Sequence, residues 1–480
     1  MKARQIAYII WTVIALLGAF CLVVPDGGWH IGTWHLRFPT LAQALDMDTK
    51  GDELSMMNDS LLAELETLGV LPSDSVVAED TIAVQDSIPP KAQPVIPEVN
   101  VSNTDSRAYL AAFYAALDSV RTMPVRVVHY GDSQIEEDRI TNVLRERWQK
   151  AYGGGGVGLL PLHQTIPTRS MRQWLSMDGV VQTVQGGPKR YLVYGPRSMR
   201  LDNDEYGVMG QVAVMDSTLV AGSEDVVMCI EPIDKKRQGH NYFNRVRVLT
   251  DSVDGYILAQ DTMLSPTPDT RHPLLYTLPD STTKCEIHLQ GKGKVYGVSL
   301  ETPTGVIVDN IPMRGCSGNI FTKIDSTQLS DFYRETNTRL IILQFGGNMI
   351  PQTENASTIS GYVRSTLRQQ VRYLRACAPD AAILFIGPSD MSTNIDGQMS
   401  TYPLVPYMDK LLKKMAAEEQ IAYWSMYDAM GGKDSMVRWI ENGLAGSDYV
   451  HFTRAGANNI GKKLYNWLMS YQSDSLNTKL

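Results

Sequence analysis

The spacing of hydrophobic residues divides the chain from about residue 105 into stretches of different character. The first contains the helical pattern "RAYLAAFYAALDSV", the unbroken apolar run "VRVVHYG" and a second helical pattern, "IEEDRITNVLRERWQKAY". A short apolar run is typical of a buried strand, whereas apolar residues three and four positions apart share one face of a helix. The pattern of residues 105–161 therefore predicts the first strand and helices of an α/β domain.

Residues 162–304 change to short strand-like runs separated by Gly, Pro, Asp and Ser. Examples are "RYLVYG", "EDVVMCIEPI", "NRVRVLTD", "KCEIHLQG" and "KVYGVSLE". Short strands without intervening helices are typical of a β-sandwich. This stretch is therefore predicted to be a separate β-rich unit.

Strands and helices alternate again from residue 305 to the end of the chain. Buried strands are predicted for "TRLIILQFGGN" and "AAILFIGPSD", and helices for "GYVRSTLRQQVRYLRACA", "PYMDKLLKKMAAEEQ" and "GANNIGKKLYNWLMSY". The pattern predicts one α/β domain in two segments, 105–161 and 305–480, with the β-sandwich 162–304 inserted between them.

The N-terminal segment has the pattern of a membrane anchor. Residues 6–24 carry no charge, and a helix of that length spans roughly 28 Å, close to the thickness of a bilayer core. Lys2 and Arg4 precede the run and Asp26 follows it, which predicts a cytoplasmic N-terminus and an extracytoplasmic, periplasmic main part. A cleaved signal peptide is the alternative. No small-x-small cleavage site follows the run, so an uncleaved single-pass anchor over 1–25 is favoured.

Residues 26–104 are predicted to be a flexible tether. They contain the acidic, Ser-rich "GVLPSDSVVAEDTIAVQDS" and the Pro-rich "IPPKAQPVIPEVNVSN". Such a composition cannot easily bury a core and is typical of an extended spacer.

Composition excludes several classes of function. The 480 residues carry a formal net charge of −8 and no dense Lys/Arg block, which argues against a nucleic-acid partner. The five cysteines form no CxxC motif, and the eight histidines are scattered without HExxH, so neither a metal site nor another cofactor is predicted. Spacing leaves open whether Cys229 and Cys285 form a disulfide.

Four short stretches carry polar residues of a catalytic type. Two of them follow predicted strands, and one precedes the last predicted helix. In open α/β sheets, sites form beyond the carboxyl ends of the strands. The stretches are Gly131-Asp132-Ser133, "RGCSGN" with Gly315 and Gly318, "FGGN" with Asn348, and "SDYVHF" with Asp448 and His451.

These residue types together suit acyl transfer. A serine hydroxyl is a weak nucleophile that needs a base, which His451 can supply to Ser133, and Asp448 can orient that base. The Ser133 and Gly318 N–H groups and the Asn348 amide can stabilise an oxyanion. The dipole of a helix opening at Ser133 would favour the same charge. Each stretch alone is more often a helix cap, a loop or an ion pair. The argument rests on all four in this order.

The four stretches resemble the conserved blocks of the SGNH (GDSL-type) hydrolases. "HYGDSQ" is similar to block I, "RGCSGN" to block II, "QFGGN" to block III and "SDYVHF" to block V. The resemblance implies a three-layer α/β/α fold with a flavodoxin-like parallel sheet. An Asp often follows the block III Asn, where this chain has Met349. The resemblance implies that Ser133 is the nucleophile, His451 its base and Asp448 the carboxylate that orients the base. The implied oxyanion donors are Ser133, Gly318 (with Gly315 as the fallback) and Asn348.

The β-rich insert between blocks I and II makes the resemblance specific to one group of these hydrolases. It is similar to peptidoglycan O-acetylesterases that carry an inserted carbohydrate-binding-like sandwich. This implies a serine esterase that removes O-acetyl groups from an extracytoplasmic glycan, with acetylated peptidoglycan or another polysaccharide as its substrate.

Two other functions remain open. A polysaccharide O-acetyltransferase, acting with a membrane partner that supplies acetyl groups, would use the same residues. A membrane-anchored glycan-binding protein without activity is the third interpretation, although the intact Ser133, Asp448 and His451 argue against it.

Overall fold

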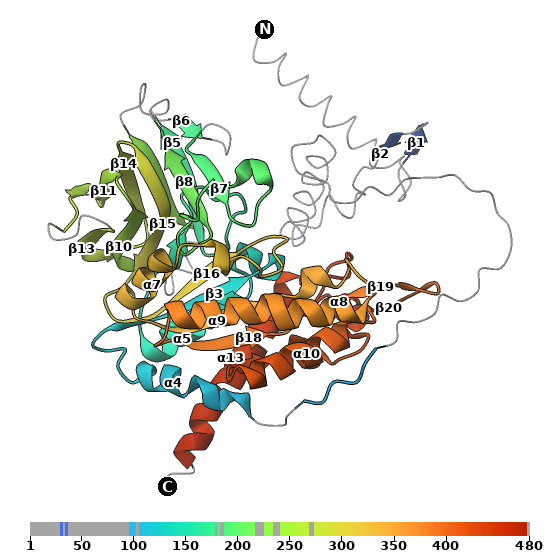
Figure 1. The fold of residues 1–480 in the computed structure, drawn as a ribbon. Helices are drawn as coiled ribbons and strands as arrows, with labels where there is room; N and C mark the ends of the chain where they lie inside the picture. The colour runs from blue at the N-terminus through green and yellow to red at the C-terminus, as the bar shows by residue number, and fades with distance from the viewer. Residues whose placement is uncertain are drawn as a thin grey trace. The chain divides into compact units, whose positions relative to one another are not determined.

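The structure is a computed structural model, drawn in Figure 1. The chain divides into two compact units, residues 1–86 and 87–480. In the first unit, an antiparallel pair is described, β1 (Trp29–Ile31) and β2 (Trp34–Leu36). The residues that the structure describes are 29–31, 34–36, 96–101, 105–177, 180–182, 187–216, 225–233, 241–267 and 273–477.

The predicted membrane anchor over residues 1–25 lies outside the described residues, as does most of the predicted tether. Within the described ranges, no helix combines the length and the apolar character needed to cross a bilayer. The anchor therefore stays a prediction from the sequence.

A five-stranded parallel sheet forms the centre of the second unit. Its strand order is β16-β3-β17-β18-β21, and every neighbouring pair is parallel. The strands read as continuous apolar runs because both faces of the sheet are covered. Their bounds are β3 (Pro124–Gly131), β16 (Gly305–Pro312), β17 (Thr338–Gln344), β18 (Ala382–Ile386) and β21 (Ala422–Trp424).

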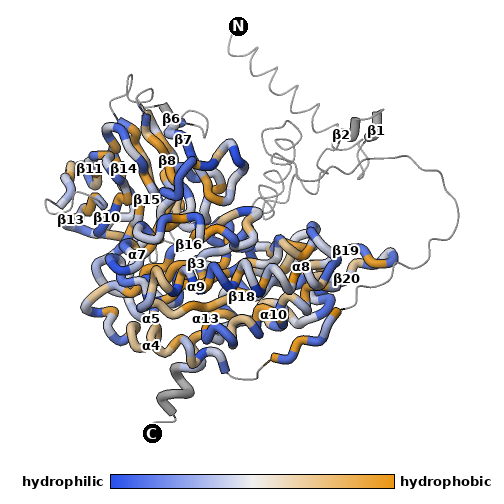
Figure 2. The backbone as a smooth tube through the Cα atoms, viewed as in Figure 1, coloured by the Kyte–Doolittle hydropathy of each residue, from blue (hydrophilic) through white to orange (hydrophobic). Residues whose placement is uncertain are grey.

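Helices cover both faces of this sheet, which gives the expected three layers (Figure 1). Successive strand residues point to opposite faces, so Val127 and Val128 belong to different hydrophobic cores. Figure 2 shows apolar residues along the central strands and on the helices beside them. One face packs α4 (Ala111–Leu117), α5 (Thr141–Tyr152) and α13 (Arg454–Asn477), and the other packs α7 (Ser326–Glu335), α9 (Arg368–Cys377) and α10 (Val405–Glu418).

Shorter elements connect these layers. They are η1 (Ser106–Leu110), η5 (Phe321–Lys323), η6 (Gly347–Met349), α8 (Ala356–Gly361), the π-helix η7 (Tyr362–Leu367), α11 (Met426–Met430), α12 (Ser435–Glu441) and the hairpin β19 (Ser392–Ile395) and β20 (Gln398–Thr401).

Two antiparallel sheets lie between α5 and β16 in the chain. Side chains from both sheets, such as Val246 and Ile287, form one shared hydrophobic core. The first sheet has the order β13-β10-β15-β8-β7, with β4 paired to β15, and the second β12-β11-β14-β9-β5-β6. The bounds are β4 (Gly158–Leu160), β5 (Met171–Met177), β6 (Val180–Gln182), β7 (Lys189–Leu192), η3 (Arg197–Met199), β8 (Gln211–Met215), β9 (Val226–Pro232), β10 (Phe243–Thr250), β11 (Asp254–Ala259), β12 (Thr262–Leu264), β13 (Leu274–Thr282), β14 (Cys285–Gln290) and β15 (Gly293–Glu301).

A buried ion cluster joins the first antiparallel sheet to the parallel sheet. The fully buried Arg126 of β3 donates to both carboxylate oxygens of Asp309 on β16, at 2.7 and 2.9 Å. It also pairs with Glu301 and donates to Ser299 Oγ of β15 at 3.0 Å. Loss of one partner would leave a buried charge uncompensated. The cluster therefore fixes β3, the strand that leads to Ser133.

Cys229 and Cys285 are both unpaired, and the open question of a disulfide is answered by the strand register. Cys229 of β9 lies directly opposite Glu286 of β14, so Cys285 is one position along its strand. Because successive side chains point to opposite faces of a sheet, the two sulfurs lie on different faces.

Candidate active site

The carboxyl ends of β3 and β17 bring the first and third predicted stretches together. Gly131 at the end of β3 pairs with Gln344 at the end of β17, and the Asp132 N–H donates to the Gln344 carbonyl at 3.2 Å. Ser133 and Asn348 follow these two strand ends directly. They therefore share one edge of the sheet, as the sequence predicts for a site in a parallel sheet.

Ser133, His451 and Asp448 form a continuous chain of hydrogen bonds. Ser133 Oγ lies 2.9 Å from His451 Nε2, and His451 Nδ1 lies 2.7 Å from Asp448 Oδ2. A proton on Nδ1 that is donated to the carboxylate leaves Nε2 as an acceptor for the serine hydroxyl. This is the arrangement of a nucleophile, its base and the group that orients the base.

The environment of Asp448 keeps its carboxylate charged. Burial alone raises the pKa of Asp448, but hydrogen bonds from the His451 ring and from the backbone N–H groups of His451 and Val450 outweigh it. Together they lower this pKa to about 2. Both backbone donors lie 3.0 Å from Oδ1. The carboxylate can therefore stabilise a charged imidazole.

Backbone hydrogen bonds hold the loop that carries this pair. The Gly446 N–H donates to the His451 carbonyl at 2.8 Å, and Ala445 forms a bridge with Phe452. Helix α13 begins at Arg454, three residues after His451, as the sequence predicts for the last helix. The loop is thus closed on one side by a bridge and on the other by a long helix.

Ser133 opens a short 3₁₀ helix and not the longer α-helix that the sequence predicts. The 3₁₀ helix η2 (Ser133–Asp138) is interrupted because Glu136 and Glu137 leave helical backbone angles, and α5 begins only at Thr141. Few peptide dipoles are aligned behind Ser133. The prediction that a helix dipole stabilises an oxyanion at Ser133 is therefore wrong. Any oxyanion must be stabilised by individual donors.

Asn348 lies beside the block II loop and Asp132. Its Nδ2 donates to the Cys316 carbonyl at 3.1 Å and to Asp132 Oδ2 at 3.4 Å. The bond to Asp132 is at the long limit for a hydrogen bond and is therefore weak. An oxyanion can replace it without loss of the bond to Cys316. The role of Asn348 as an oxyanion donor stays a prediction.

Gly318 occupies a backbone position that only glycine suits. Its N–H forms a hydrogen bond within the block II loop. Its φ is +82°, and an added Cβ would lie 2.8 Å from the Phe345 ring. The Gly318 N–H donates to Cys316 Sγ at 3.2 Å. Gly315, the fallback, also has a positive φ, +70°, but faces open space. The oxyanion role of either glycine stays a prediction.

Asp132 is a site residue whose importance the sequence analysis missed. It is buried, its Oδ1 accepts the Gln134 N–H at 3.0 Å, and its Oδ2 accepts the Asn348 amide. Burial raises the pKa of Asp132 to about 6, against smaller lowering effects from the Gln134 N–H and the nearby His451. Its position directly before the serine was the one signal for it.

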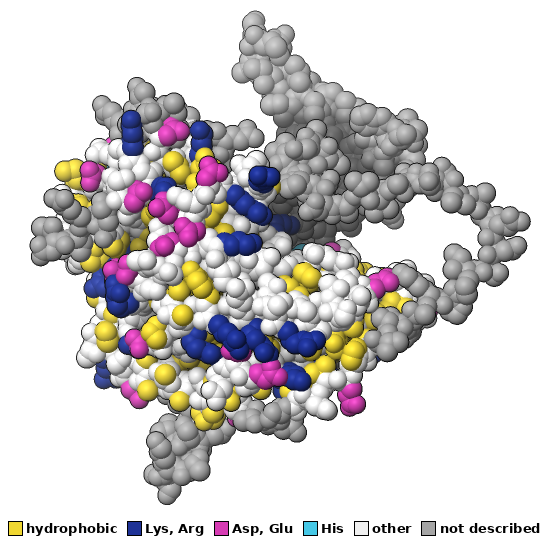
Figure 3. Space-filling view, viewed as in Figure 1, with side chains coloured by type: hydrophobic (Ala, Val, Ile, Leu, Met, Phe, Trp, Pro, Cys, Tyr) yellow, Lys and Arg dark blue, Asp and Glu magenta, His cyan; other side chains and the backbone are white. Residues whose placement is uncertain are grey.

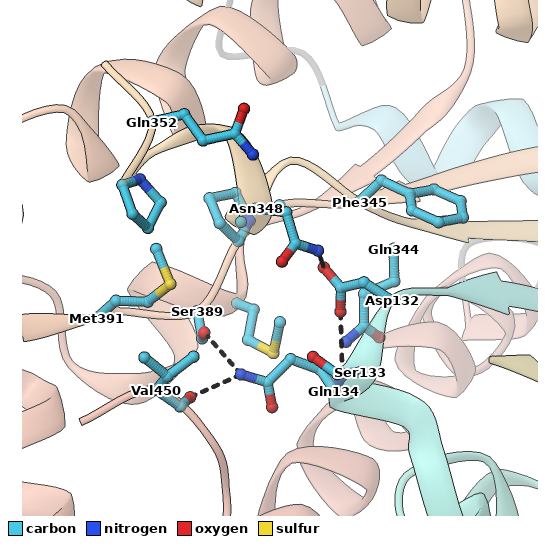
Figure 4. Close-up of a pocket in the computed structure, with 15 residues that line it drawn as sticks. Asp132, Ser133, Gln134, Gln344, Phe345, Asn348, Gln352, Ser389, Met391 and Val450 are labelled. Atoms are coloured by element: carbon cyan, nitrogen blue, oxygen red, sulfur yellow. Dashed lines mark hydrogen bonds between the residues drawn. The ribbon is translucent and has the colours of Figure 1, made fainter. Parts of the chain in front are cut away.

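A pocket of about 270 Å³ opens beside Ser133 (Figure 4). Gln134 Nε2 fixes one wall by donating to the Val450 carbonyl at 2.7 Å and to Ser389 Oγ at 3.3 Å. Figure 4 shows Gln352 and Met391 across the pocket from Ser133. Asp132 is the one ionisable residue among those that line the pocket. The other lining residues contribute amide or hydroxyl groups, backbone atoms or apolar side chains. The pocket therefore suits an uncharged part of a ligand. Within the described ranges, no cluster of His, Cys, Asp or Glu is arranged to hold a metal ion.

Residues 280–458 match the model of the GDSL-like lipase/acylhydrolase family. The chain carries a GDSL-type hydrolase domain. The matched segment includes Gly318, Asn348, Asp448 and His451, while Ser133 precedes it. The comparison with curated proteins finds no match.

One solved structure is similar in fold to most of this chain. A peptidoglycan O-acetylesterase is 20% identical, with a TM-score of 0.59, and the match covers 77% of this chain and 98% of that chain. At this identity, the likeness shows the fold alone. An acetyl xylan esterase matches with a TM-score of 0.27, 12% identity and coverage of 34% and 80%. The periplasmic domain of a lipopolysaccharide acetyltransferase from Salmonella ser. Paratyphi A has a TM-score of 0.24, 13% identity and coverage of 34% and 72%. These two scores are too low to bear on this chain.

Proposed function

We propose that this GDSL-type hydrolase is a serine esterase that removes O-acetyl groups from an extracytoplasmic glycan, with peptidoglycan as the first candidate. The observation that carries the proposal is the hydrogen-bonded chain from Ser133 through His451 to Asp448. An ester-hydrolysing activity agrees with the family of residues 280–458.

The reaction follows from the positions of these side chains. The Ser133 oxygen attacks the acetyl carbonyl carbon while His451 Nε2 takes the hydroxyl proton. The tetrahedral oxyanion is held by N–H donors, for which the Asn348 amide is the side-chain candidate. The glycan hydroxyl leaves with the proton from His451. Water then attacks the carbonyl carbon of the acetyl-enzyme while His451 takes a proton from it, and the Ser133 oxygen leaves with that proton, so that acetate is released and the Ser133 hydroxyl is restored.

Two further observations support the acetylated glycan and its location outside the cytoplasm. The apolar run 6–24 and the charges that flank it support a location outside the cytoplasm. The pocket beside Ser133 is much larger than an acetyl group, and its mainly apolar lining carries amide and hydroxyl groups, among them those of Gln134, Gln352 and Ser389. These few polar groups on an apolar wall support a substrate whose alcohol part is a sugar, because a sugar ring has apolar C–H faces beside its hydroxyl or amide groups.

The test uses the full chain, purified in detergent, and its Ser133→Ala variant. Acetate release is measured from O-acetylated peptidoglycan and from 4-nitrophenyl acetate, after circular dichroism confirms equal folding. We expect release from both esters by the parent protein and from neither by the variant. Equal activity of the two proteins would refute the role of Ser133. Transfer of acetyl to an added sugar, in place of acetate release, would identify a transferase that uses the same residues.

A further inference from the structure

One side chain joins the loop that carries the base to the segment that carries the nucleophile. We call residues 446–452, which include His451, the base loop. Gln134 directly follows Ser133 in the chain. Its Nε2 donates to the carbonyl of Val450, the residue before His451, at 2.7 Å (Figure 4). A hydrogen bond thus connects the residue after the nucleophile with the residue before the base.

The side chain of Gln134 is fixed from several directions. It is buried, with 6% of the residue exposed. Its Nε2 also donates to Ser389 Oγ, although at 3.3 Å, and its backbone N–H donates to Asp132 Oδ1 at 3.0 Å. A carbonyl can only accept a hydrogen bond, so the end of the amide that faces Val450 must be the nitrogen. The shorter bond, to Val450, therefore determines the orientation of the amide.

Two further carbonyls of the base loop accept longer bonds from outside it. The Ser392 N–H donates to the Tyr449 carbonyl at 3.2 Å. Arg139 Nη1 donates to the Phe452 carbonyl at 3.5 Å. The first bond is between backbone groups, and the second is at the limit for a hydrogen bond and is therefore weak. Among the described residues outside the base loop, Gln134 thus supplies the strongest side-chain restraint on the backbone beside the base.

We propose that Gln134 is a positioning residue of this esterase, whose bond to the base loop keeps His451 within proton-transfer distance of Ser133. The inference rests on the proposed esterase function. The distance of 2.9 Å between Ser133 Oγ and His451 Nε2 leaves little room for displacement, since an error of about 1 Å in such a geometry can cost about 10²-fold in rate. Gln134 also lines the pocket, so direct contact with the substrate is the competing role. The two roles predict different kinetics.

The first experiment compares the full chain with its Gln134→Met variant. Methionine has a similar length and adapts to the same space but carries no N–H donor. We expect kcat to fall about tenfold with both 4-nitrophenyl acetate and O-acetylated peptidoglycan, with KM unchanged within about twofold, because the same base serves both reactions. A contact with the glycan would instead raise KM for peptidoglycan alone. That outcome, or an unchanged kcat, overturns the inference.

Gln149 of α5 provides a matched control. It is buried, with 2% exposed, and its Nε2 donates to the carbonyls of Gly156 and Val306 at 3.0 and 3.3 Å. In both glutamines, the described residues supply no donor to the buried Oε1. Val306 lies at the start of β16, at the opposite end of the parallel sheet from Ser133. Gln149→Met should therefore lower the melting temperature as much as Gln134→Met does but leave kcat unchanged. Equal losses of kcat would overturn the inference, because kcat would then follow stability.

Gln134→Glu adds a readout that a purely structural role would not change. A protonated carboxyl can donate to the Val450 carbonyl as the amide does, whereas an ionised carboxylate can only accept and is repelled by it. Burial raises the pKa of a carboxyl at this position, so we expect the kcat ratio of variant to parent to fall at least about tenfold between about pH 6 and about pH 9. The ratio removes the titration of Asp132 and His451, which both proteins share. A ratio that does not change with pH overturns the inference.

Gln369→Glu controls for the added charge. Gln369 is an exposed residue of α9, along which Figure 3 shows a row of Lys and Arg side chains. Two of these, Arg368 and Arg372, pair with Glu419. Helix α9 packs on the face of the sheet opposite α13, the helix that follows the base loop. The kcat ratio of Gln369→Glu to the parent should therefore stay constant with pH. The same trend in both variants would assign the effect to general charge and overturn the inference.

Labelling with a fluorophosphonate tests the positioning role without an ester substrate. Ser133 Oγ attacks the phosphorus and displaces fluoride while His451 takes the hydroxyl proton. Gln134→Met should be labelled about tenfold more slowly than the parent, and Ser133→Ala not at all. Equal rates for the parent and Gln134→Met overturn the inference. If the parent is labelled but hydrolyses neither ester, the proposed function fails, and the labelling rates still decide the role of Gln134.

Discussion

Ser133 Oγ and His451 Nε2 are 2.9 Å apart although 318 positions separate the two residues in the sequence. The first residue follows a central strand of the parallel sheet, and the second precedes the last helix. The two antiparallel sheets lie between them in the chain without separating them in space. The contact places a base within reach of the serine proton, which is the first requirement for a general base.

Replacement of Ser133 by Ala should lower kcat/KM by at least about 10³-fold, because the nucleophile is removed while the pocket stays intact. Asp448→Asn should also lower kcat, since the imidazole loses the carboxylate that orients it. Initial rates with 4-nitrophenyl acetate measure both effects. Ser389→Ala is the control, because Ser389 lines the same pocket and bonds to Gln134 and not to His451. A loss of similar size in Ser389→Ala would indicate general damage to the pocket.

Asn348→Ala should reduce kcat by about 10²-fold and change KM little, as expected for a donor that acts mainly on the transition state. Its amide is in place between Cys316 and Asp132, and its long bond to Asp132 can be exchanged for one to the oxyanion. Steady-state kinetics on one ester separates the two constants. Gln352→Ala, in the same pocket, serves as the control. A tenfold rise in KM with unchanged kcat in Asn348→Ala would assign this residue to substrate binding.

Local sequence patterns were sufficient to predict β3, β17 and β18 of the central sheet, but not its edge strands β16 and β21, and to place Ser133, Asn348 and His451 relative to these elements. The apolar runs ending at Gly131 and Gln344 became neighbouring parallel strands, and both lead to polar residues at one edge. The last helix follows His451 as predicted. These features depend on periodicity and on the general rule that sites form at the carboxyl ends of strands.

Other features depended on tertiary contacts that no local pattern contains. The 3₁₀ helix after Ser133 ends because Glu136 and Glu137 leave helical angles, although their sequence pattern suits a helix. The pairing of Glu136 with Arg314 joins residues 178 positions apart. Met391 and Gln352 reach the pocket from loops whose positions are set by packing. Sequence reasoning could therefore place Ser133 at the sheet edge but not the walls of the pocket beside it.

Gly318→Ala should lower the melting temperature and the activity more than Gly315→Ala. Both glycines have a positive φ, so each variant pays a similar backbone cost of about 1 kcal/mol. At Gly318 the new methyl group would also lie 2.8 Å from the Phe345 ring, whereas at Gly315 it meets nothing within 4 Å. Thermal unfolding and kcat/KM of both variants make the comparison. Equal losses in the two variants would contradict the packing of Gly318 against Phe345.

Asp132→Asn should lower activity and, at the same time, change the pH dependence of stability. The pKa of Asp132 is raised by burial from 3.8 to about 6 in the folded protein. Between these values the folded state binds a proton that the unfolded state has lost, so wild-type stability falls as pH rises through this window and is level above it. Asparagine does not ionise, so the free energy of unfolding of the variant should rise relative to wild type from about pH 4 to about pH 6.

Urea unfolding of both proteins across this pH range measures the difference, and the exposed Asp202→Asn is the control because it should show no such trend. The activity of Asp132→Asn should fall at every pH, because an asparagine has one acceptor oxygen and cannot replace both Oδ1, which accepts the Gln134 N–H, and Oδ2, which accepts the Asn348 amide. A flat difference in unfolding free energy would show that burial does not raise the pKa of Asp132 above its value in the unfolded chain. Full activity of the variant would show that Asn348 is positioned by Cys316 alone.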